Sequence, residues 1–550
     1  MNEEPESKNN VSALMTRVRH GYERSATGLE SVISFLDRRY TPLGRFAPGP
    51  FEGWGFLWQP AILGFLAMCA ILAGSSFSDA PFKLNMAHTW FFGVPTRTGY
   101  APSPDNETTL LFSIVLVYGG LLLLMRVWLR LAEVMRNHPG APLKMIWRTF
   151  ILWCVPMLIA PPLFSRDVFS YAAQGEMTSH HINPYILGPF DAMTGPYFAP
   201  VDPLWGHTPA PYGPFFLFLD GSIAKLTGHN AMATVVVLRL LEFFAVLLLG
   251  WGLTKLASAL GRDPSEALLL GALNPLVLLS LIGGAHNDAL MAALLVVGLS
   301  FAVRKKPMWG IFFCACATAV KAPAALGILY IAWTWLGPYV QLRKKFLPFA
   351  KATIVTVVTL GVFTLLAGFG LGWVKNLATP GTVRSWAAPA TGLGEVISAL
   401  SHSLGISVST TSVISATRAI GFLISVGSAI WLLINADRRG WLRSLAISLL
   451  LFVVFGPVVQ PWYLCWGLVL LAAVYVGREH FWLLALSITA PFLGLPGARQ
   501  LLHGLIHANP FAMIASLAIL GVMLLVPMGK WTQWSWKQTH GDAEILATSQ

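Results

Sequence analysis

Uncharged apolar runs of roughly 20 residues constrain the fold of this chain more than any other feature of its sequence. As helices, runs of that length cross the hydrocarbon core of a bilayer, which is about 30 Å thick. They lie near 57–77, 108–130, 147–164, 231–257, 347–370 and 411–434. Hydrophobic residues make up 55% of the chain and charged residues 11%, against about 45–50% and 25% in soluble domains. The sequence therefore excludes a soluble enzyme and predicts a polytopic membrane protein.

Shorter apolar runs come in closely spaced pairs, a pattern that predicts helical hairpins. The pairs are 267–283 with 288–303, 308–321 with 322–338, 444–458 with 463–476, and 481–495 with 510–527. Together the runs predict an all-α protein of roughly fourteen transmembrane helices.

The limits of these runs divide the chain into three parts. We expect a cytoplasmic N-terminal tail (1–56), a transmembrane domain (57–528) and a cytoplasmic C-terminal tail (529–550). In the first tail, residues of roughly 11–38 have the pattern of one amphipathic helix.

The placement of positive charge predicts the orientation of the chain. Lys and Arg (37) exceed Asp and Glu (25) by 12, and most of the excess lies in alternate loops, which marks the cytoplasmic side of an inner membrane. Both termini then lie in the cytoplasm. A positive charge placed in this way does not indicate nucleic-acid binding.

One expected cytoplasmic helix start provides a local check of this orientation. Asp263, Pro264 and Glu266 have the pattern of an N-cap, a first helical residue and the acidic residue that completes a capping box. The pair Asn274-Pro275 should bend the same helix.

Two outer loops are too long and too rich in polar and aromatic residues to be simple connectors. The main loop spans 165–229, where 212–229 is too short and too polar to be expected as a span, and the second spans 371–408. Short hairpins bring further polar residues to the same side, which predicts a shared cavity at the outer leaflet. No repeat relates the two halves of the chain, which counts against the rival class, a transporter or lipid flippase.

Asp167 follows the third apolar run and shares a helix face with Tyr171, four residues further on. A carboxylate in a partly buried site is suited to act as the general base for a hydroxyl. The alternative is that Asp167 caps a helix of the loop.

His286, Asn287 and Asp288 form a second polar group, which follows a Gly-Gly turn between two apolar runs. These side chains are suited to binding a sugar, a phosphate or a metal. The alternative is that Asn287 or Asp288 caps the following helix.

Isolated cations are candidates for contact with an anionic lipid head group. Lys321 lies in a long apolar stretch, where it either extends to the interface or contacts a phosphate, and Arg166 and Arg384 are expected on the same side. Arg239 lies three residues before Glu242 inside a run, so the two most simply neutralise each other, although Arg239 is also placed to face a lipid phosphate.

The cysteines and the His503–His507 pair do not indicate a metal site. The five cysteines lack metal-ligand spacing, and His503 and His507 lack a third ligand. Trp462 and Tyr463 at an outer turn either anchor the chain at the interface or stack on a sugar.

Several blocks of sequence carry a resemblance to a known family. They are SRDVFSYAAQG (165–175), NPY (183–185), TPAPYGP (208–214), NP (274–275), GGAHNDALM (283–291), KAP (321–323) and PWY (461–463). In this order they resemble the polyprenol-phosphate-mannose-dependent α-1,6-mannosyltransferases of actinobacterial lipomannan synthesis, in the type C glycosyltransferase superfamily. The resemblance covers about 145–470, and SHHI at 179–182 departs from the Gly-containing turn expected there.

The resemblance implies a reaction. Such enzymes take a sugar from a polyprenyl phosphate whose head group faces outward and transfer it, with inversion, to the hydroxyl of a glycolipid or glycan acceptor. Asp167 would deprotonate the acceptor. The phosphate would be held by the cations Lys321, Arg166, Arg239 and Arg384. The other substrate-binding candidates are Tyr171, Tyr185, Tyr212, His286, Asn287, Asp288, Trp462 and Tyr463.

The identity of the sugar is left open by the sequence. Discrimination between related sugars rests on a few hydrogen bonds, so arabinose or glucose carried on the same lipid would be transferred by the same chemistry. No resident metal is assigned, and a requirement for a divalent metal is left open.

Overall fold

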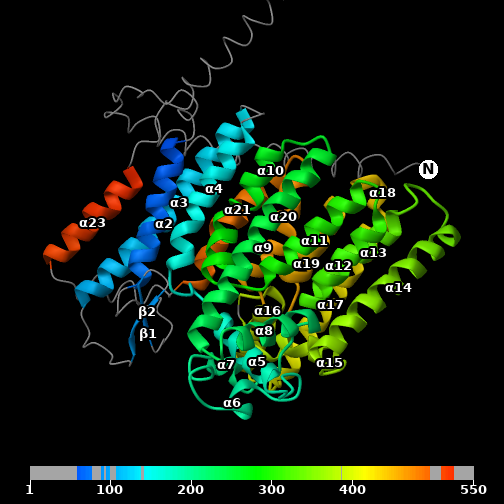
Figure 1. Cartoon of the computed structure of the whole chain (residues 1–550), viewed down its shortest axis with the longest axis horizontal. Coiled ribbons are helices and arrows are strands. Elements are labelled where there is room, and N and C mark those ends of the chain that lie inside the picture. Colours follow the sequence, from blue (N-terminus) through cyan, green and yellow to red (C-terminus); the bar gives the residue numbers. More distant parts are fainter. Residues whose placement is uncertain are drawn as a thin grey trace, which may run out of the picture.

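The computed structural model describes residues 58–76, 88–91, 94–98, 107–137, 142–385, 387–495 and 510–525. The expected N-terminal amphipathic helix, the C-terminal tail and the His503–His507 pair lie outside the described residues. The described chain is a bundle of helices (Figure 1), as predicted, with one departure. Strands β1 (His88–Phe91) and β2 (Val94–Thr98) form an antiparallel hairpin in which His88 pairs with Thr98.

Among the described residues, five segments are helical, long and apolar enough to cross a membrane, which supports a multi-pass membrane protein. They are α2 (Trp58–Ser76), Leu111–Glu133 within α3 (Glu107–Asn137), α9 (Ala231–Ala259), α14 (Leu342–Ala367) and α17 (Thr410–Ile434). A sixth is added if the π-helical segment η1 (Val277–Gly283) and α11 (Asp288–Val303), which meet at 117°, are counted as one broken span.

The predicted count of about fourteen spans is not confirmed, because many of the paired apolar runs form shorter helices. The other helices of the bundle are α4 (Leu143–Ile159), α10 (Pro264–Gly271), α12 (Pro307–Val320), η2 (Ala322–Ala324), α13 (Ala325–Thr334), α19 (Trp441–Val454), η4 (Pro461–Leu464), α20 (Cys465–Val474), α21 (Glu479–Thr489), η5 (Ala490–Gly494) and α23 (Pro510–Leu525).

The segments expected in the two outer loops lie together at one end of the bundle, at the bottom of Figure 1. They contain α5 (Asp167–Ser179), α6 (Pro189–Ala192), α7 (Pro203–Gly206), α8 (Pro214–Leu226), α15 (Gly372–Lys375), η3 (Asn376–Thr382) and α16 (Pro389–Ser403). Helices α10 and α18 (Ala436–Arg439), from segments expected on the cytoplasmic side, lie at the opposite end. The grouping of the loops therefore agrees with the alternation predicted from positive charge.

The expected N-cap and first residue of α10 are confirmed, whereas the Glu266 carboxylate accepts a hydrogen bond from the Tyr475 hydroxyl. Asp263 is the N-cap, its side chain accepts a hydrogen bond from the backbone N–H of Ser265, and Pro264 is the first helical residue. The α-helix ends at Gly271, and Asn274 satisfies the freed backbone by donating to the Leu270 carbonyl and accepting from the N–H of Leu276. The predicted break at Asn274-Pro275 is therefore present.

Helices α2 and α4 pack closely where Trp153 of α4 lies against Gly64 of α2. Trp153 of α4 donates its indole N–H to the carbonyl of Ala61 in α2 at 2.9 Å. Its ring lies against Gly64, where a Cβ atom would come within 2.0 Å of the indole. Any larger residue at position 64 would therefore separate α2 from α4.

Candidate functional site

The chain makes a sharp turn immediately before Asp167. Phe164 has a positive φ of 61°, which is uncommon for a residue other than glycine. The hydroxyl of Ser165 then accepts the backbone N–H of Asp167 at 3.1 Å. Arg166 occupies the N-cap position and Asp167 is the first residue of α5. The alternative that Asp167 is the N-cap is therefore wrong, and its carboxylate is available for other contacts.

The carboxylate of Asp167 faces the imidazole of His286. Nε2 of His286 lies 3.7 Å from Oδ2 of Asp167, and the His286 side chain is 1% exposed against 15% for Asp167. Nδ1 of the same ring lies 2.6 Å from the carbonyl oxygen of Ser280. A carbonyl only accepts, so Nδ1 carries a proton. In the neutral ring Nε2 is then a base directed at Asp167, and the pair can share one proton between them.

Burial changes the acidity of this carboxyl. Helix α5 lies outside the membrane-spanning helices, and burial there raises the pKa of Asp167 above its ordinary value, with Asp288 adding to the rise and His286 and Lys321 opposing it. A raised pKa makes Asp167 a stronger proton acceptor than an exposed aspartate.

Asp288 and Lys321 form a buried ion pair beside this centre. Nζ of Lys321 lies 2.9 Å from both carboxylate oxygens of Asp288, whose side chain is fully buried. Oδ1 of Asp288 also accepts the indole N–H of Trp466 at 2.5 Å. Lys321 comes from the end of α12 and Asp288 from the first turn of α11, so the pair connects two hairpins.

Three aromatic rings also lie close to the Lys321 ammonium. Its Nζ lies 4.6 Å from the ring centre of Tyr463, 5.6 Å from Trp466 and 5.7 Å from Tyr212. Cations are attracted to the faces of such rings. Lys321 is 12% exposed, so its ammonium is engaged by Asp288 and these rings and is largely shielded from solvent.

The same aromatic wall connects to His286. The imidazole stacks on Trp462, with ring centres 3.8 Å apart and planes at 21°, and Trp462 packs against Tyr463 at 6.0 Å. Tyr171 meets Tyr212 edge to face at 5.1 Å. The predicted residues from α5, from the turn before α11, from the α12–η2 junction and from η4 therefore form one centre.

Asn287 completes this centre with unused hydrogen-bonding capacity. It occupies the N-cap position of α11, but its side chain does not cap the helix. Both polar atoms of the buried side chain lack a partner within the described part of the chain, a costly arrangement for a buried amide. The alternative that Asn287 serves as a side-chain cap is therefore wrong, and the amide is suited to a substrate.

The other predicted cations have different surroundings. Guanidinium N–H groups of Arg239 donate to the carbonyls of Leu158, Ala160 and Gly283. Arg384 is exposed in the second outer loop, where it donates to the hydroxyl of Thr411 at 2.8 Å. Arg166 adjoins Asp167, and its buried Nε has no partner among the residues described. By position, Arg166 is a better candidate than Arg239 or Arg384 for an anion beside Asp167.

Tyr185 belongs to a neighbouring cluster. It packs with Ala210, Leu217 and Trp373, and its carbonyl accepts from Asn376 at 3.0 Å. Asp220 of α8 lies near the Tyr185 hydroxyl and is fully buried; within the described chain neither of its carboxylate oxygens has a hydrogen-bond partner. Burial accordingly raises the pKa of Asp220 well above its usual value.

Two residues of the centre were not predicted. Trp466 of α20 donates to Asp288, and its spacing of four residues from Trp462 was an available signal, because residues four apart lie on one face wherever a run is α-helical. Ser280 orients His286 through its backbone carbonyl, for which no side-chain pattern exists.

Comparison with known proteins identifies relatives over most of the chain. A family model described as "Alpha-(1->6)-mannopyranosyltransferase, N-terminal domain" matches residues 61–337, and one described as "MptB C-terminal domain" matches 390–526. Alpha-(1->6)-mannopyranosyltransferase A of Mycobacterium tuberculosis is 32% identical over 469 residues, covering 82% of this chain and 86% of the relative. Alpha-(1->6)-mannopyranosyltransferase B of Corynebacterium glutamicum is 29% identical over 457 residues, covering 76% and 74%.

Proposed function

This chain belongs to the alpha-(1->6)-mannopyranosyltransferase family, and from that membership we propose that it is a membrane mannosyltransferase. We infer that the donor is polyprenyl-phosphate mannose and the acceptor a hydroxyl of an α-1,6-linked mannan or lipomannan-type molecule at the outer face of the cytoplasmic membrane. The observation that carries the proposal is the buried centre in which Asp167 faces His286 beside the Lys321–Asp288 pair.

Asp167 acts as the base in this proposal. As the acceptor oxygen bonds to the anomeric carbon of mannose, the proton of the acceptor hydroxyl moves to the Asp167 carboxylate. Nε2 of His286, 3.7 Å away, is placed to share that proton, because its Nδ1 proton is committed to the Ser280 carbonyl at 2.6 Å. His286 thus stabilises protonated Asp167 without having to touch the sugar.

The leaving group requires stabilisation of negative charge. Breaking the bond between the anomeric carbon and the phosphate oxygen converts a phosphodiester into a polyprenyl phosphate monoester with one more negative charge. The Lys321 ammonium has three N–H groups, and Asp288 does not exhaust them. We assign the remaining N–H to the phosphate, with Arg166 as the second cation, because fixed donors directed at developing charge lower a barrier most effectively.

An inverting mechanism follows from these assignments. Direct displacement places the acceptor oxygen and the phosphate on opposite sides of the anomeric carbon. Asp167 on α5 and Lys321 at the α12–η2 junction belong to different elements and are therefore suited to serve the two sides separately. The Asn287 amide is left to orient a sugar hydroxyl.

The test is transfer of labelled mannose from polyprenyl-phosphate mannose by membranes containing the full chain. We expect Asp167→Asn to lose about 10²–10⁴ in rate, the usual contribution of a general base. Asp191→Asn is the matched control, because Asp191 is a partly exposed carboxylate of the same loop that pairs with His207, and it should keep normal transfer.

Two results would overturn parts of the proposal. Full transfer by Asp167→Asn would remove the base. Preference for the glucose or arabinose derivative of the lipid, supplied in parallel, would replace mannose as the donor sugar while leaving the assignment of Asp167 intact.

A further inference from the structure

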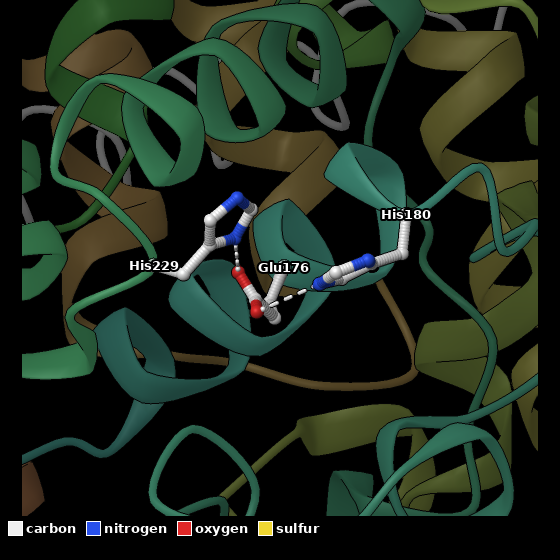
Figure 2. A group of neighbouring side chains, drawn as sticks. All are labelled: Glu176, His180 and His229. Carbon is white, nitrogen blue, oxygen red and sulfur yellow. Dashed lines mark hydrogen bonds and ion pairs between the residues drawn. The ribbon is translucent and has the colours of Figure 1, made fainter.

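A group of three side chains suited to metal binding lies at the far end of α5 from Asp167. Glu176 belongs to the last turns of α5, His180 follows the end of that helix, and His229 lies in the turn between α8 and α9. In Figure 2 both imidazole rings point at the Glu176 carboxylate. Residues separated by 53 positions in sequence are thereby brought together.

The geometry of the three groups is close to that of a coordination shell. Nε2 of His180 lies 3.1 Å from one carboxylate oxygen of Glu176, and Nδ1 of His229 lies 2.9 Å from the other. One ligand atom from each residue falls within 4.8 Å of the others. Ligand atoms of a tetrahedral zinc site are separated by roughly 3.3 Å, given bonds of about 2.0–2.1 Å, so small rotations of the side chains suffice.

The carboxylate of the group is buried and the two imidazoles are partly exposed. The Glu176 side chain is 8% exposed and is held in the helix, whereas His180 and His229 are 46% and 43% exposed. Ions can therefore reach the site from the solvent. His229 is directed inward by a backbone turn in which it and Gly228 both have positive φ, 58° and 61°.

We propose that Glu176, His180 and His229 bind a divalent transition-metal ion, with zinc as the best match. Two imidazoles and one carboxylate suit zinc, which accepts nitrogen and oxygen ligands and imposes little geometry of its own. On binding, each ring nitrogen that now faces the carboxylate offers its lone pair to the ion, and the neutral imidazole carries its proton on the other ring nitrogen. Water would complete the coordination shell.

The site joins α5 to the α8–α9 turn and is separate from the transfer centre. Glu176 is nine residues after Asp167, which is roughly 13 Å along a helix. The metal is therefore a positioning element: it holds the C-terminal end of α5, the helix whose first residue is Asp167. The proposal does not depend on the identity of the donor or on mannosyl transfer.

The experiment measures zinc bound to the full chain in detergent. The protein carries an affinity tag without histidine, is treated with EDTA, desalted, and equilibrated with zinc chloride at pH 7.5. We expect about one zinc per chain by elemental analysis, and a rise in Tm on zinc addition.

Substitutions identify the ligands. Glu176→Gln keeps a hydrogen-bond acceptor but removes the charge, and His229→Ala removes one imidazole; each should weaken binding by more than ~100-fold, since even loss of an outer-shell partner costs about 10–100-fold. His207→Ala is the control, because His207 is an exposed histidine of the same loop that pairs with Asp191.

Three results would overturn the proposal. The first is that the wild-type protein binds no zinc at pH 7.5. The second is that wild type and Glu176→Gln bind equal amounts of zinc. The third is that zinc raises the Tm of wild type and of His229→Ala by the same amount. If His229→Ala does not fold, His180→Asn replaces it, because His180 is the more exposed ligand.

Discussion

Replacing Lys321 with methionine separates the two tasks we assign to its ammonium, which are to pair with Asp288 and to hold the donor phosphate. Methionine has a similar length and no charge, so Lys321→Met leaves the packing against Tyr463 and Trp466 largely intact. It removes the partner of a fully buried carboxylate 2.9 Å away, and leaves the Trp466 indole as a donor to Asp288.

The expected magnitudes differ for stability and for catalysis. Removing one partner of a buried ion pair costs about 3–5 kcal/mol, which should lower the Tm by at least a few degrees. Adding Asp288→Asn removes the uncompensated charge and keeps an oxygen that accepts from Trp466, so the double variant should recover most of that stability. Transfer should remain about 10²–10³-fold slow in both variants, because neither has the donor directed at the developing phosphate charge.

The assay combines Tm in detergent with single-turnover transfer of labelled mannose. Recovery of both stability and transfer in the double variant would refute the phosphate contact and leave Lys321 only as a partner of Asp288. Unchanged Tm in Lys321→Met would refute the argument from the buried pair itself.

Three further predictions concern α5 and its neighbours. The acid limb of the transfer rate should lie at a higher pH than the ordinary pKa of an aspartate, because Asp167 must be ionised and burial raises its pKa; a limb at or below that ordinary value would contradict this, and a pH profile measures it. Asp220→Asn should raise the Tm, and the difference in Tm from wild type should grow as the pH rises from about 4. Burial raises the pKa of the Asp220 carboxyl in the folded protein, so this carboxyl stabilises the fold below its unfolded pKa and loses that contribution as the pH increases. A difference in Tm that stays constant from about pH 4 to 8 would count against this. Gly175→Ala should cost about 1–3 kcal/mol, because its Cβ would lie 2.6 Å from the carbonyl oxygen of Asp220, whereas Gly427→Ala, with open space around it, should be neutral or stabilising; equal Tm values for the two variants would contradict the close contact between α5 and α8.

The composition of the site was predictable because its residues lie at helix ends in an otherwise apolar chain. Asp167, His286 and Lys321 each stand beside a turn that glycine, proline or a short polar segment marks in the sequence. Hairpins that bring such turns to one side must bring the polar residues together, and Figure 1 shows the outer-loop helices gathered at one end.

The partners of these residues were not predictable, since they depend on how the hairpins pack. Lys321 pairs with Asp288 across 33 positions, and the Glu176–His229 contact spans 53. The number of spans was also not predictable from apolar runs alone. Such a run has the same composition whether it crosses the bilayer or breaks into short helices, as around η1 and α11, which meet at 117°.

Arg239 links the helix α9 to the two chain segments that carry Asp167 and His286. Its guanidinium binds the carbonyls of Ala160, seven residues before Asp167, and of Gly283, three residues before His286. The backbone N–H of Leu163 also donates to Gly283 at 2.9 Å. Helix α9 is therefore bonded through Arg239 to both the segment before Asp167 and the segment before His286. If α9 tilts as the bilayer thickness changes, the Asp167 carboxylate and the His286 imidazole should move together. We expect the spacing of the proton-sharing pair to be insensitive to the lipid in which the enzyme is embedded.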